Sequence, residues 1–549
     1  MPRTAAAAAP VGPLERGLGV LRVLSRSPQG RLTAGALAKE TGLARSTVDR
    51  IAATLVHLGY LRDEDRELVL APRLLHLGAA YLRACGVPAA VGPLAAALAD
   101  RLDESVSVAV PDADAVRFVV QHTRRRALAA SFRVGDALPA DRCAPGALFA
   151  AEWPQERFAA RWSRPPRDFP ALPGAYRPRI DDDRLRALAA EAAGRGWSAD
   201  DQLVEPGLVA VAVPVRDATG RTVCALSAVS HTSRHTAEGL RAYALEPLRD
   251  TAARMTQALA APPAASAPSD QGDPGAPATD PTAQAKRELG PEYLQSLARG
   301  LAVLTALGAA PGLTLSAVAQ ATGLARATAR RSLLTLEQLG YATSADGTFS
   351  LLPAVLDLGY PLLSGLPLGD IARPHLAALV RQVHESASVA VLDGPDIRYV
   401  SRVAAGRIMS VDITEGTRFP ARATSMGRVL LAGLPAGERA ARLSAADLAP
   451  LTPYTVTGRD ALERIIDGVA ADGYAVVDQE LEQGLCSIAV PVRGARGETV
   501  AAVNVALHSG RTSAEEARTA ILPALRATAA AISADAAAVL AAQAGAGPR

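Results

Sequence analysis

Two short stretches of the chain place arginine and hydroxyl side chains in the first turns of a predicted helix. A guanidinium group can bridge O6 and N7 of guanine or bind a phosphate, and hydroxyl groups bind phosphates. In a helix that enters the major groove, residues near the N-terminus reach the base edges. The alternative is an ordinary solvated helix face. The pattern predicts contact with double-stranded DNA through Arg45, Ser46, Thr47, Arg50, Arg326, Thr328, Arg330 and Arg331.

The neighbouring elements favour the DNA-binding interpretation. A helix over 326–339 follows a short helix over 316–321 and a Thr-Gly-Leu turn. A hairpin with an Asp-Gly turn is predicted over 341–352. Three helices and a hairpin make a winged helix-turn-helix. Ala44 and Ala325 stand where a capping side chain is expected, so the helix starts should be slightly weakened.

The whole chain is an internal repeat. Leu14–Leu21 recurs as Leu297–Leu304, and other short motifs recur in the same order at an offset of about 280 residues. A stretch rich in Pro, Ala, Ser, Gly and Asp separates the two copies and is expected to be a flexible linker. The predicted division is 11–73 and 291–353 for the winged helices, 74–260 and 354–535 for larger α/β domains, and 261–290 for the linker.

The larger domains place polar residues within apolar strands. Ser487 precedes an Ile-Ala-Val-Pro-Val run, and Asn504 interrupts another apolar strand. Asp478 and Glu482 are on the loop before the first of these strands. A polar group in such a strand is costly unless it is hydrogen-bonded, and small-molecule pockets place a few polar groups on apolar walls. The pattern indicates a ligand pocket, with hydrogen bonding to neighbouring backbone as the alternative.

Composition excludes several classes of protein. The 549 residues contain 58 basic and 55 acidic side chains, a net charge of +3, which excludes a polybasic nucleic-acid coat. The four cysteines form no Cys-x-x-Cys pair, which favours a reducing compartment. No uninterrupted apolar run reaches the roughly 18 residues of a membrane span, and the N-terminus lacks a signal-peptide layout. We therefore expect a cytoplasmic protein without a membrane partner.

Catalytic motifs are absent from the sequence. It contains no Gly-x-Ser-x-Gly, no phosphate-binding Gly-x-x-x-x-Gly-Lys-Ser/Thr, no His-Glu-x-x-His and no dinucleotide-binding glycine motif. The eight histidines show no ligand-like spacing. We expect no enzyme activity, no metal and no cofactor. The alternative from this class is an enzyme acting on small acids with Cys486 or Cys143 as nucleophile.

Several long motifs resemble the IclR-type transcriptional regulators, over both copies outside the linker and tails. The second copy is most similar to the branch that controls the protocatechuate and β-ketoadipate pathway. The motifs that carry this resemblance are Tyr293–Leu304, Thr322–Arg331, Thr424–Ala432 and Val477–Val492.

The resemblance implies an α+β protein in which each winged helix-turn-helix precedes a GAF-like α/β effector domain, assembled as a homo-oligomer. It implies operator DNA and a small organic acid as partners, such as protocatechuate, 4-hydroxybenzoate or β-ketoadipate. By family position, the effector contacts are Ser425, Met426, Gly427, Asp478, Ser487, Asn504 and Ala506.

Two features depart from the family pattern. The chain is a tandem fusion, so one chain could act as a covalent pseudo-dimer. The first copy has also lost pocket polarity, because Ala210 replaces Ser487, Ser227 replaces Asn504, and the start Thr424–Gly427 reads Cys143–Gly146. We hypothesise that the second copy senses ligand, whereas the first is architectural or binds something else. Open alternatives are an unrelated metabolite as effector and a scaffold that no longer binds DNA.

Overall fold

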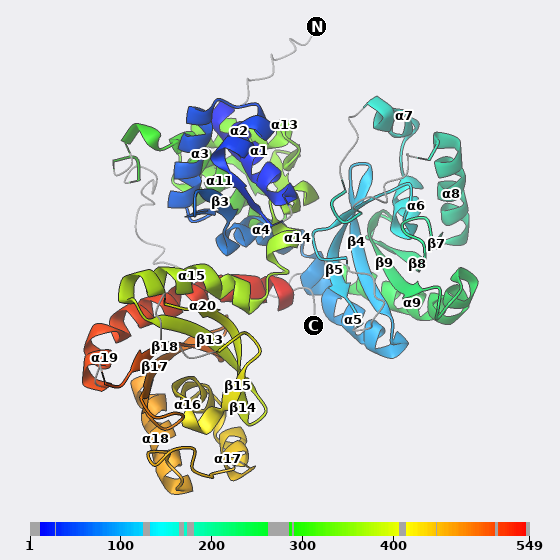
Figure 1. Ribbon diagram of the computed structural model, residues 1–549. Helices are drawn as coiled ribbons and strands as arrows, with labels where there is room; N and C mark the ends of the chain where they lie inside the picture. The colour runs from blue at the N-terminus through cyan, green and yellow to red at the C-terminus, as the bar shows by residue number, and fades with distance from the viewer. Residues whose placement is uncertain are drawn as a thin grey trace. The chain divides into compact units, whose positions relative to one another are not determined.

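The computed structural model describes residues 11–27, 29–124, 132–163, 169–172, 180–261, 285–287, 290–405, 413–445, 447–510 and 514–544. Most of the predicted linker 261–290 and the predicted strand 407–413 lie outside these residues. The chain divides into two compact units, one made of Met1–Gly365 with Ala542–Arg549 and the other of Leu366–Ala541 (Figure 1). The first unit holds both winged-helix domains and the first α/β domain, and the second holds the second α/β domain.

Both winged-helix domains have the same element order. The first comprises α1 (Gly12–Arg26), β1 (Arg31–Thr33), α2 (Ala34–Thr41), α3 (Arg45–His57), β2 (Leu61–Glu64) and β3 (Glu67–Leu70). The second comprises α11 (Gln295–Ala306), β10 (Leu313–Thr314), α12 (Leu315–Thr322), α13 (Arg326–Gln338), β11 (Ala342–Ala345) and β12 (Thr348–Leu351).

Local chemistry explains how these helices start and stop. The Thr33 hydroxyl accepts a hydrogen bond from the Ala36 N–H at 3.2 Å and caps α2. Gly42 ends α2 with φ of 67°, a left-handed conformation that glycine adopts without steric cost. No side chain caps α3 at Ala44 or α13 at Ala325, as the sequence predicted. The predicted hairpin is also present, but its second strand pairs with an additional short strand that precedes the second helix, giving the orders β1-β3-β2 and β10-β12-β11.

The two winged-helix domains pack against each other through their first helices, α1 and α11. A Cβ atom on Gly17 would lie 2.4 Å from Leu297, and one on Gly300 would lie 2.4 Å from Leu14. Each glycine thus lets a leucine of the other copy come close. The backbone N–H of Val11 donates to the Thr335 hydroxyl at 3.0 Å. The same contacts occur twice with the roles of the copies exchanged, which defines a pseudo-two-fold pair within one chain.

Short elements connect each winged helix to the domain that follows it. In the first copy these are η1 (Pro72–Leu74) and α4 (Leu75–Cys85), and in the second η4 (Pro353–Asp357) and α14 (Tyr360–Leu363), with η3 (Leu307–Ala309) after α11. Helix α4 packs against η3 and η4 of the second copy. The connecting elements therefore extend the contact between the copies.

Each α/β domain contains a six-stranded antiparallel sheet. The first domain comprises α5 (Val87–Leu102), β4 (Ser105–Asp112), β5 (Ala115–His122), β6 (Ala137–Pro139), α6 (Ala144–Ala150), α7 (Gln155–Ser163), α8 (Asp182–Arg195), β7 (Ser198–Asp201), β8 (Leu208–Arg216), β9 (Thr222–His231) and α9 (Ala237–Ala260). The second comprises α15 (Leu368–Val383), β13 (Ser386–Asp393), β14 (Asp396–Val403), β15 (Arg418–Pro420), η5 (Ala421–Ala423), α16 (Ser425–Ala432), α17 (Ala436–Ala445), α18 (Arg459–Asp472), β16 (Ala475–Asp478), β17 (Leu485–Arg493), β18 (Thr499–His508), α19 (Ala514–Ala520) and α20 (Leu522–Ala544). Their strand orders correspond, β6-β5-β4-β9-β8-β7 and β15-β14-β13-β18-β17-β16.

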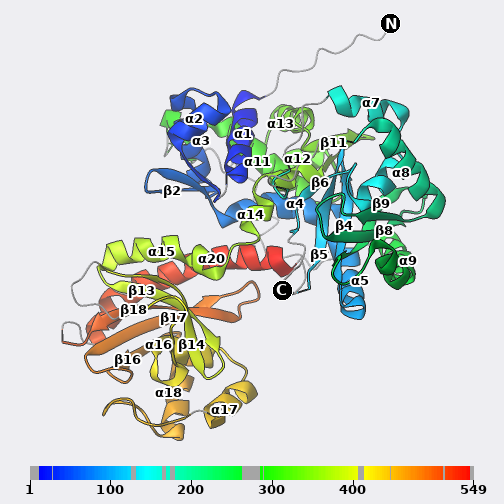
Figure 2. The same cartoon turned by 45° about the vertical axis from the view of Figure 1, so that its right-hand side comes forward.

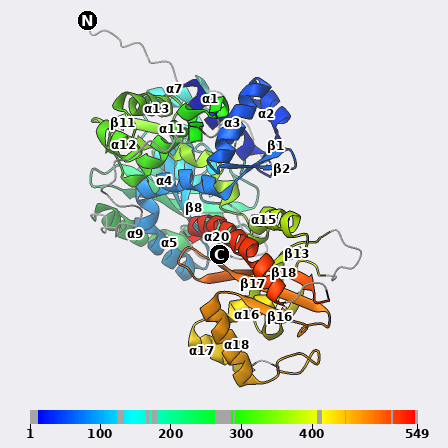
Figure 3. The same ribbon diagram turned by 90° about the vertical axis from the view of Figure 1, so that its left-hand side faces the viewer.

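Helices cover both faces of the second sheet. Helices α15 and α20 lie side by side over one face (Figure 2), and α16 lies against the other (Figure 3). Alternate strand residues feed two separate cores, because successive side chains in a strand point to opposite faces. One core, with Ile488 and Val503, packs under α15 and α20, and the other, with Ala489 and Ala502, packs under α16 and α18.

Helix α20 is long and apolar enough to cross a membrane by length and composition alone, over Leu522–Gln543. The bent pair α4 with α5, counted as one span, passes the same test. No uninterrupted apolar run marks α20 in the sequence, because Arg526 and Asp535 interrupt it. In the structure, α20 buries Leu525 and Ile532 in the core of the second sheet, and 28% of its apolar window is buried.

Candidate nucleic-acid interface and effector pocket

The start of α3 presents the side chains that the sequence singled out. Arg45, Ser46 and Arg50 are exposed, whereas Thr47 is half-buried. The Arg45 side chain is 61% exposed and pairs with Asp49 one turn later, with 2.9 Å between Nε and Oδ1. Arg50 donates to the Pro291 carbonyl oxygen of the second copy at 2.8 Å. Thus α3 exposes basic groups, two of which are already held by neighbours.

The start of α13 is more strongly basic. Arg326, Arg330 and Arg331 are exposed, and Thr328 is half-buried. None of these arginines forms an ion pair within the part of the chain that the structure describes. Arg330 occupies the helical position at which α3 carries Asp49. Asp49 was not among the residues predicted from the sequence, although an Arg and an Asp four residues apart on a helix signal such a pair.

The effector pocket predicted for the second α/β domain begins at the N-terminus of α16. The Thr424 hydroxyl accepts a hydrogen bond from the Gly427 N–H at 3.0 Å and caps this helix. A Cβ atom at Gly427 would lie 2.0 Å from the Ala421 carbonyl oxygen, so only glycine fits there. The start of α16, with Ser425 and Met426 both buried, is therefore fixed tightly against the preceding chain.

Three of the predicted effector residues meet between α16 and the sheet. The Ser425 and Ser487 hydroxyl oxygens lie 2.8 Å apart. Strand register places Ser487 opposite Ala506, and Asn504 opposite Ala489, so all four strand residues share the face that α16 covers. Asn504 is 5% exposed, and its Oδ1 has no hydrogen-bond partner among the described residues. A buried acceptor in this state costs about 1–3 kcal/mol unless a ligand or water completes it.

Asp478 is placed differently from the other predicted pocket residues. It is exposed at the end of β16 and lies opposite Cys486, whose side chain faces the core under α15 and α20. Glu480 is a buried acid of this region that was not among the predicted pocket residues. The Arg428 Nη2 donates to Glu480 Oε2 at 2.6 Å, and both side chains are at most 10% exposed. The Val456 N–H donates to the same oxygen at 3.1 Å.

A second buried guanidinium, that of Arg422, also escaped the sequence analysis. Arg422 is 6% exposed and lies in η5, just before the cap of α16. Its Nη2 donates to the Ala449 carbonyl oxygen at 2.7 Å, whereas Nη1 has no acceptor in the described part of the chain. A buried cation with an unused donor favours an anion nearby. Sequence alone gives no signal for this, because most arginines are solvent-exposed.

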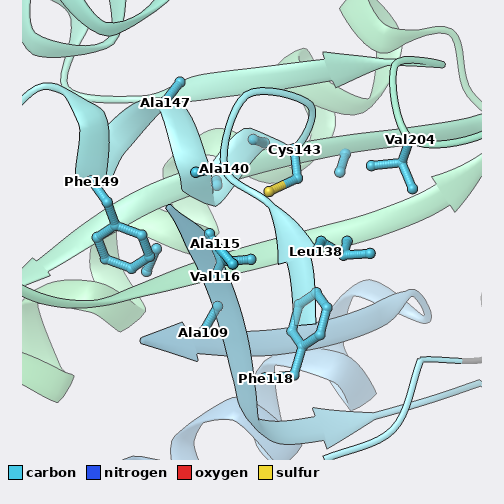
Figure 4. Close-up of a cluster of buried hydrophobic side chains, with 14 of the residues drawn as sticks. Ala109, Ala115, Val116, Phe118, Leu138, Ala140, Cys143, Ala147, Phe149 and Val204 are labelled. Carbon is cyan, nitrogen blue, oxygen red and sulfur yellow. The ribbon is translucent and has the colours of Figure 1, made fainter. Parts of the chain in front are cut away.

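The corresponding face of the first α/β domain carries a different set of polar groups. Strand register places Ser107 opposite Ser227 and Gln121, and the Ser107 hydroxyl and the Gln121 amide are buried without a hydrogen-bond partner among the described residues. Ala210 and Ser227 stand where the second domain has Ser487 and Asn504, and the Ser227 hydroxyl donates to the Ser107 carbonyl oxygen at a long 3.5 Å. Figure 4 shows the corresponding core, in which Phe118, Leu138 and Val204 belong to the same buried cluster as Cys143, the residue that precedes α6. An acid effector on this face would therefore meet Ser107, Gln121 and Ser227 in place of Ser487 and Asn504.

The buried ion pair of the second domain also has no equivalent in the first. Ala147 and Leu203 occupy the positions of Arg428 and Glu480. Both line a cavity of about 120 Å³ between α6, α8 and β7. The first domain therefore keeps the fold while replacing this ion pair by two apolar side chains beside a cavity that Asp141, Arg142, Glu191 and Arg195 also line.

The cysteines considered as nucleophiles have the wrong environment for that role. Burial and the nearby Asp478 charge raise the pKa of Cys486 to about 11. Burial likewise raises the pKa of Cys143 far above its usual value. A nucleophilic cysteine needs a lowered pKa, because the thiolate is the reactive form. Across the residues that the structure describes, no group of three or more His, Cys, Asp or Glu side chains is arranged to hold a metal ion.

Paired winged helices with exposed basic recognition helices, each followed by a sheet domain with a covered polar face, define a DNA-binding regulator with a sensor domain. Family comparison agrees and is specific. The IclR helix-turn-helix domain matches residues 13–65 and 296–346, and the C-terminal domain of the bacterial transcriptional regulator IclR matches 79–257 and 361–534. The chain therefore belongs to the IclR family of bacterial transcriptional regulators, in a tandem form with two copies of each domain.

Individual relatives match one copy's length. The Pca regulon regulatory protein of Pseudomonas putida is 42% identical over 284 residues, which is 51% of this chain and 92% of the relative. The p-hydroxybenzoate hydroxylase transcriptional activator of Acinetobacter baylyi is 35% identical, over 43% of this chain and 90% of its own. Among solved structures, the putative transcriptional regulator RHA06195 from Rhodococcus sp. RHA1 is 54% identical, covering 45% of this chain and 99% of its own with a TM-score of 0.43.

Proposed function

We propose that this regulator controls genes of aromatic-acid breakdown in the cytoplasm, binding operator DNA through α3 and α13 and a small organic acid in the second α/β domain. The proposed DNA contacts are those on the two recognition helices, and the proposed effector contacts are those at the start of α16 and on strands β17 and β18. The names of the relatives, which refer to a Pca regulon and to p-hydroxybenzoate hydroxylase, support an aromatic hydroxy acid or a product of its breakdown as effector.

The observation that carries the effector proposal is the unsatisfied Asn504 side chain beside the Ser425–Ser487 pair. Hydroxyl and amide groups on an otherwise apolar face would orient a carboxylate or phenol, and Arg422 would add positive charge nearby. The first α/β domain has Ala210 and Ser227 in place of Ser487 and Asn504, and on this difference we assign acid sensing to the second domain. Ligand can shift the regulator between DNA-binding states only by its differential affinity for them.

Titration calorimetry of the full chain tests this assignment. The ligands are 4-hydroxybenzoate, protocatechuate and β-ketoadipate, with 4-hydroxybenzyl alcohol as the probe that lacks the carboxylate. We expect one acid to bind one site per chain, and Asn504→Ala and Ser487→Ala each to weaken it about tenfold, the usual value of one hydrogen bond. Ser227→Ala is the matched control in the first domain and should change nothing. The assignment would be excluded if Ser227→Ala weakened binding while the combined variant Asn504→Ala with Ser487→Ala did not.

Footprinting on DNA flanking the gene tests the regulatory function itself. We expect two protected half-sites whose protection weakens or shifts when the bound acid is added. Protection should fall with rising salt, since phosphate contacts release counterions. Protection that no tested acid alters would retain DNA binding and discard the aromatic-acid effector.

We further propose that chains associate into homo-oligomers, each chain contributing one pair of winged helices.

A further inference from the structure

The pairing of the winged-helix domains is complete within one chain. Helix α3 contacts α11 and α13 contacts α1, so each recognition helix rests on the first helix of the other copy. The hydrogen bond from Val11 to Thr335 is matched by one from the Leu294 N–H to the Thr54 hydroxyl at 2.9 Å. Thr54 and Thr335 are each at most 1% exposed. The surface that a second chain would use for pairing is thus already occupied.

The two recognition helices in this fixed pair differ where they would meet bases. Asp49 on α3 and Arg330 on α13 occupy the same helical position, and both are exposed. Arginine there can bridge O6 and N7 of guanine, whereas a carboxylate can only accept hydrogen bonds, as from cytosine N4. On α3, Asp49 forms an ion pair with Arg45 one turn earlier. The two matching positions on α13 are Arg326 and Arg330, which carry the same charge and cannot form such a pair.

The two wings also differ in charge, and again the first copy carries the acidic side chains. The turn of the first wing is flanked by Glu64 and Glu67, which both pair with Arg31, at 3.2 and 3.4 Å. The second wing carries Ala345 and Thr348 at the corresponding positions. Acidic groups near a phosphate backbone weaken binding, so the two winged helices cannot be interchangeable on DNA.

We infer that a single chain reads both halves of its operator, and that the two half-sites differ in sequence, α13 reading the half that carries guanine opposite Arg330. This inference rests on the proposed DNA-binding function and deepens it. The operator then has a direction, because the α3 half and the α13 half are different sites. A second chain would add another pair of half-sites and would not complete the first.

Selection from a random double-stranded DNA library with the purified full chain tests the inference. We expect enrichment of two unlike half-sites in one fixed order, with one chain bound per pair when the complex mass is measured. In Asp49→Arg, the base preference should change in one half only, by roughly ten- to a hundredfold at one position. Arg330→Ala should relax the other half only. The control is Glu246→Arg, which makes the same charge reversal at an exposed position on α9 and should change the base preference in neither half.

The possible outcomes distinguish a failure of the unlike half-sites from a failure of DNA binding itself. Identical half-sites, a change in both halves with Asp49→Arg, or two chains sharing one pair would overturn the inference and leave DNA binding intact. No enrichment of any sequence, with no salt-sensitive binding, would overturn both. Asp49 and Arg330 are exposed, so their variants should fold, and circular dichroism of each variant checks this directly.

Discussion

Arg117 on β5 of the first α/β domain reaches Asp357 in η4, 240 residues later in the chain, with 2.6 Å between Nη1 and Oδ1. The same guanidinium, only 1% exposed, also binds Asp112 and donates to the Gly135 carbonyl oxygen at 2.7 Å. The corresponding arginine of the second domain, Arg398, pairs with Asp393 at 3.2 Å but is 46% exposed. The same arginine position therefore forms buried ion pairs in the first unit and a solvent-exposed ion pair in the second.

The buried ion pairs of Arg117 should contribute much more to stability than the exposed Arg398–Asp393 pair. Arg117→Ala leaves Asp112 buried without its cation, so we expect a loss of about 3–5 kcal/mol in the free energy of unfolding. Arg398→Ala should cost at most about 1 kcal/mol, as exposed pairs do. Urea unfolding followed by circular dichroism measures both. Equal losses for the two variants would show that the Arg117 contacts are not formed as described.

The Arg428–Glu480 pair should show strong coupling. Glu480→Leu alone strands a buried guanidinium and is expected to cost about 3–5 kcal/mol. The double variant Arg428→Ala with Glu480→Leu installs the residues that the first domain uses, Ala147 and Leu203. It should lose clearly less than the sum of the single variants, because no unpaired charge remains. A double-mutant cycle by urea unfolding measures this, and additive losses would contradict it.

Asp200 should make the first α/β domain less stable as pH rises. Burial raises the pKa of this carboxyl to about 7, while its side chain is 1% exposed and accepts from the Leu203 N–H at 2.7 Å. Between about pH 4 and 7 the folded state keeps a proton that the unfolded state has lost, so stability falls over this window and levels off above pH 7. The total change is a few kcal/mol in order of magnitude.

Asp200→Asn should flatten that pH dependence, because a carboxamide keeps the acceptor but does not titrate. Urea unfolding at several pH values, followed by tryptophan fluorescence, is the measurement, since all three tryptophans (Trp153, Trp162 and Trp197) belong to this domain. Asp201→Asn, at the exposed neighbouring position, is the control and should leave the profile unchanged. A difference between the wild-type and Asp200→Asn profiles that does not fall between pH 4 and 7 would contradict the burial argument.

The cap of α16 should matter for both stability and effector binding. Thr424→Ala removes the acceptor for the Gly427 N–H and is expected to cost about 1 kcal/mol, the usual value of such a cap. Because Ser425 follows directly, a frayed start should also weaken acid binding by several-fold. Thr424→Ser retains the hydroxyl and should behave like the wild type in calorimetry. A similar weakening in both variants would point to the lost methyl group as the cause.

Local patterns predicted the winged helices well. The helices 316–321 and 326–339 and the Asp346–Gly347 turn carry their signals in adjacent residues: apolar periodicity, a glycine stop and a turn dipeptide. The structure confirms them within a residue or two. Strands β1 and β10, of three and two residues, were missed because such short strands exist only through pairing with a distant partner.

The candidate pocket was predictable only in part. Ser487 and Asn504 stand out because a polar residue within an apolar strand is unusual, and the structure places both on the face covered by α16. Glu480 and Arg422 were missed because charged residues in a loop look solvated until tertiary packing buries them. The same limit applies to Asp49, whose significance emerges only when α3 and α13 are compared as partners in one pair.

The pseudo-two-fold packing of α1 on α11 has a genetic consequence. In a homodimer, every substitution appears twice, on both sides of the symmetry axis, so each surface must serve in both positions. Here the sides are encoded by separate stretches of one gene, and a substitution such as one at Asp49 or Ala147 appears once. Each half can therefore lose or change a property while the other preserves it, at a fixed one-to-one ratio and independent of how much protein the cell makes.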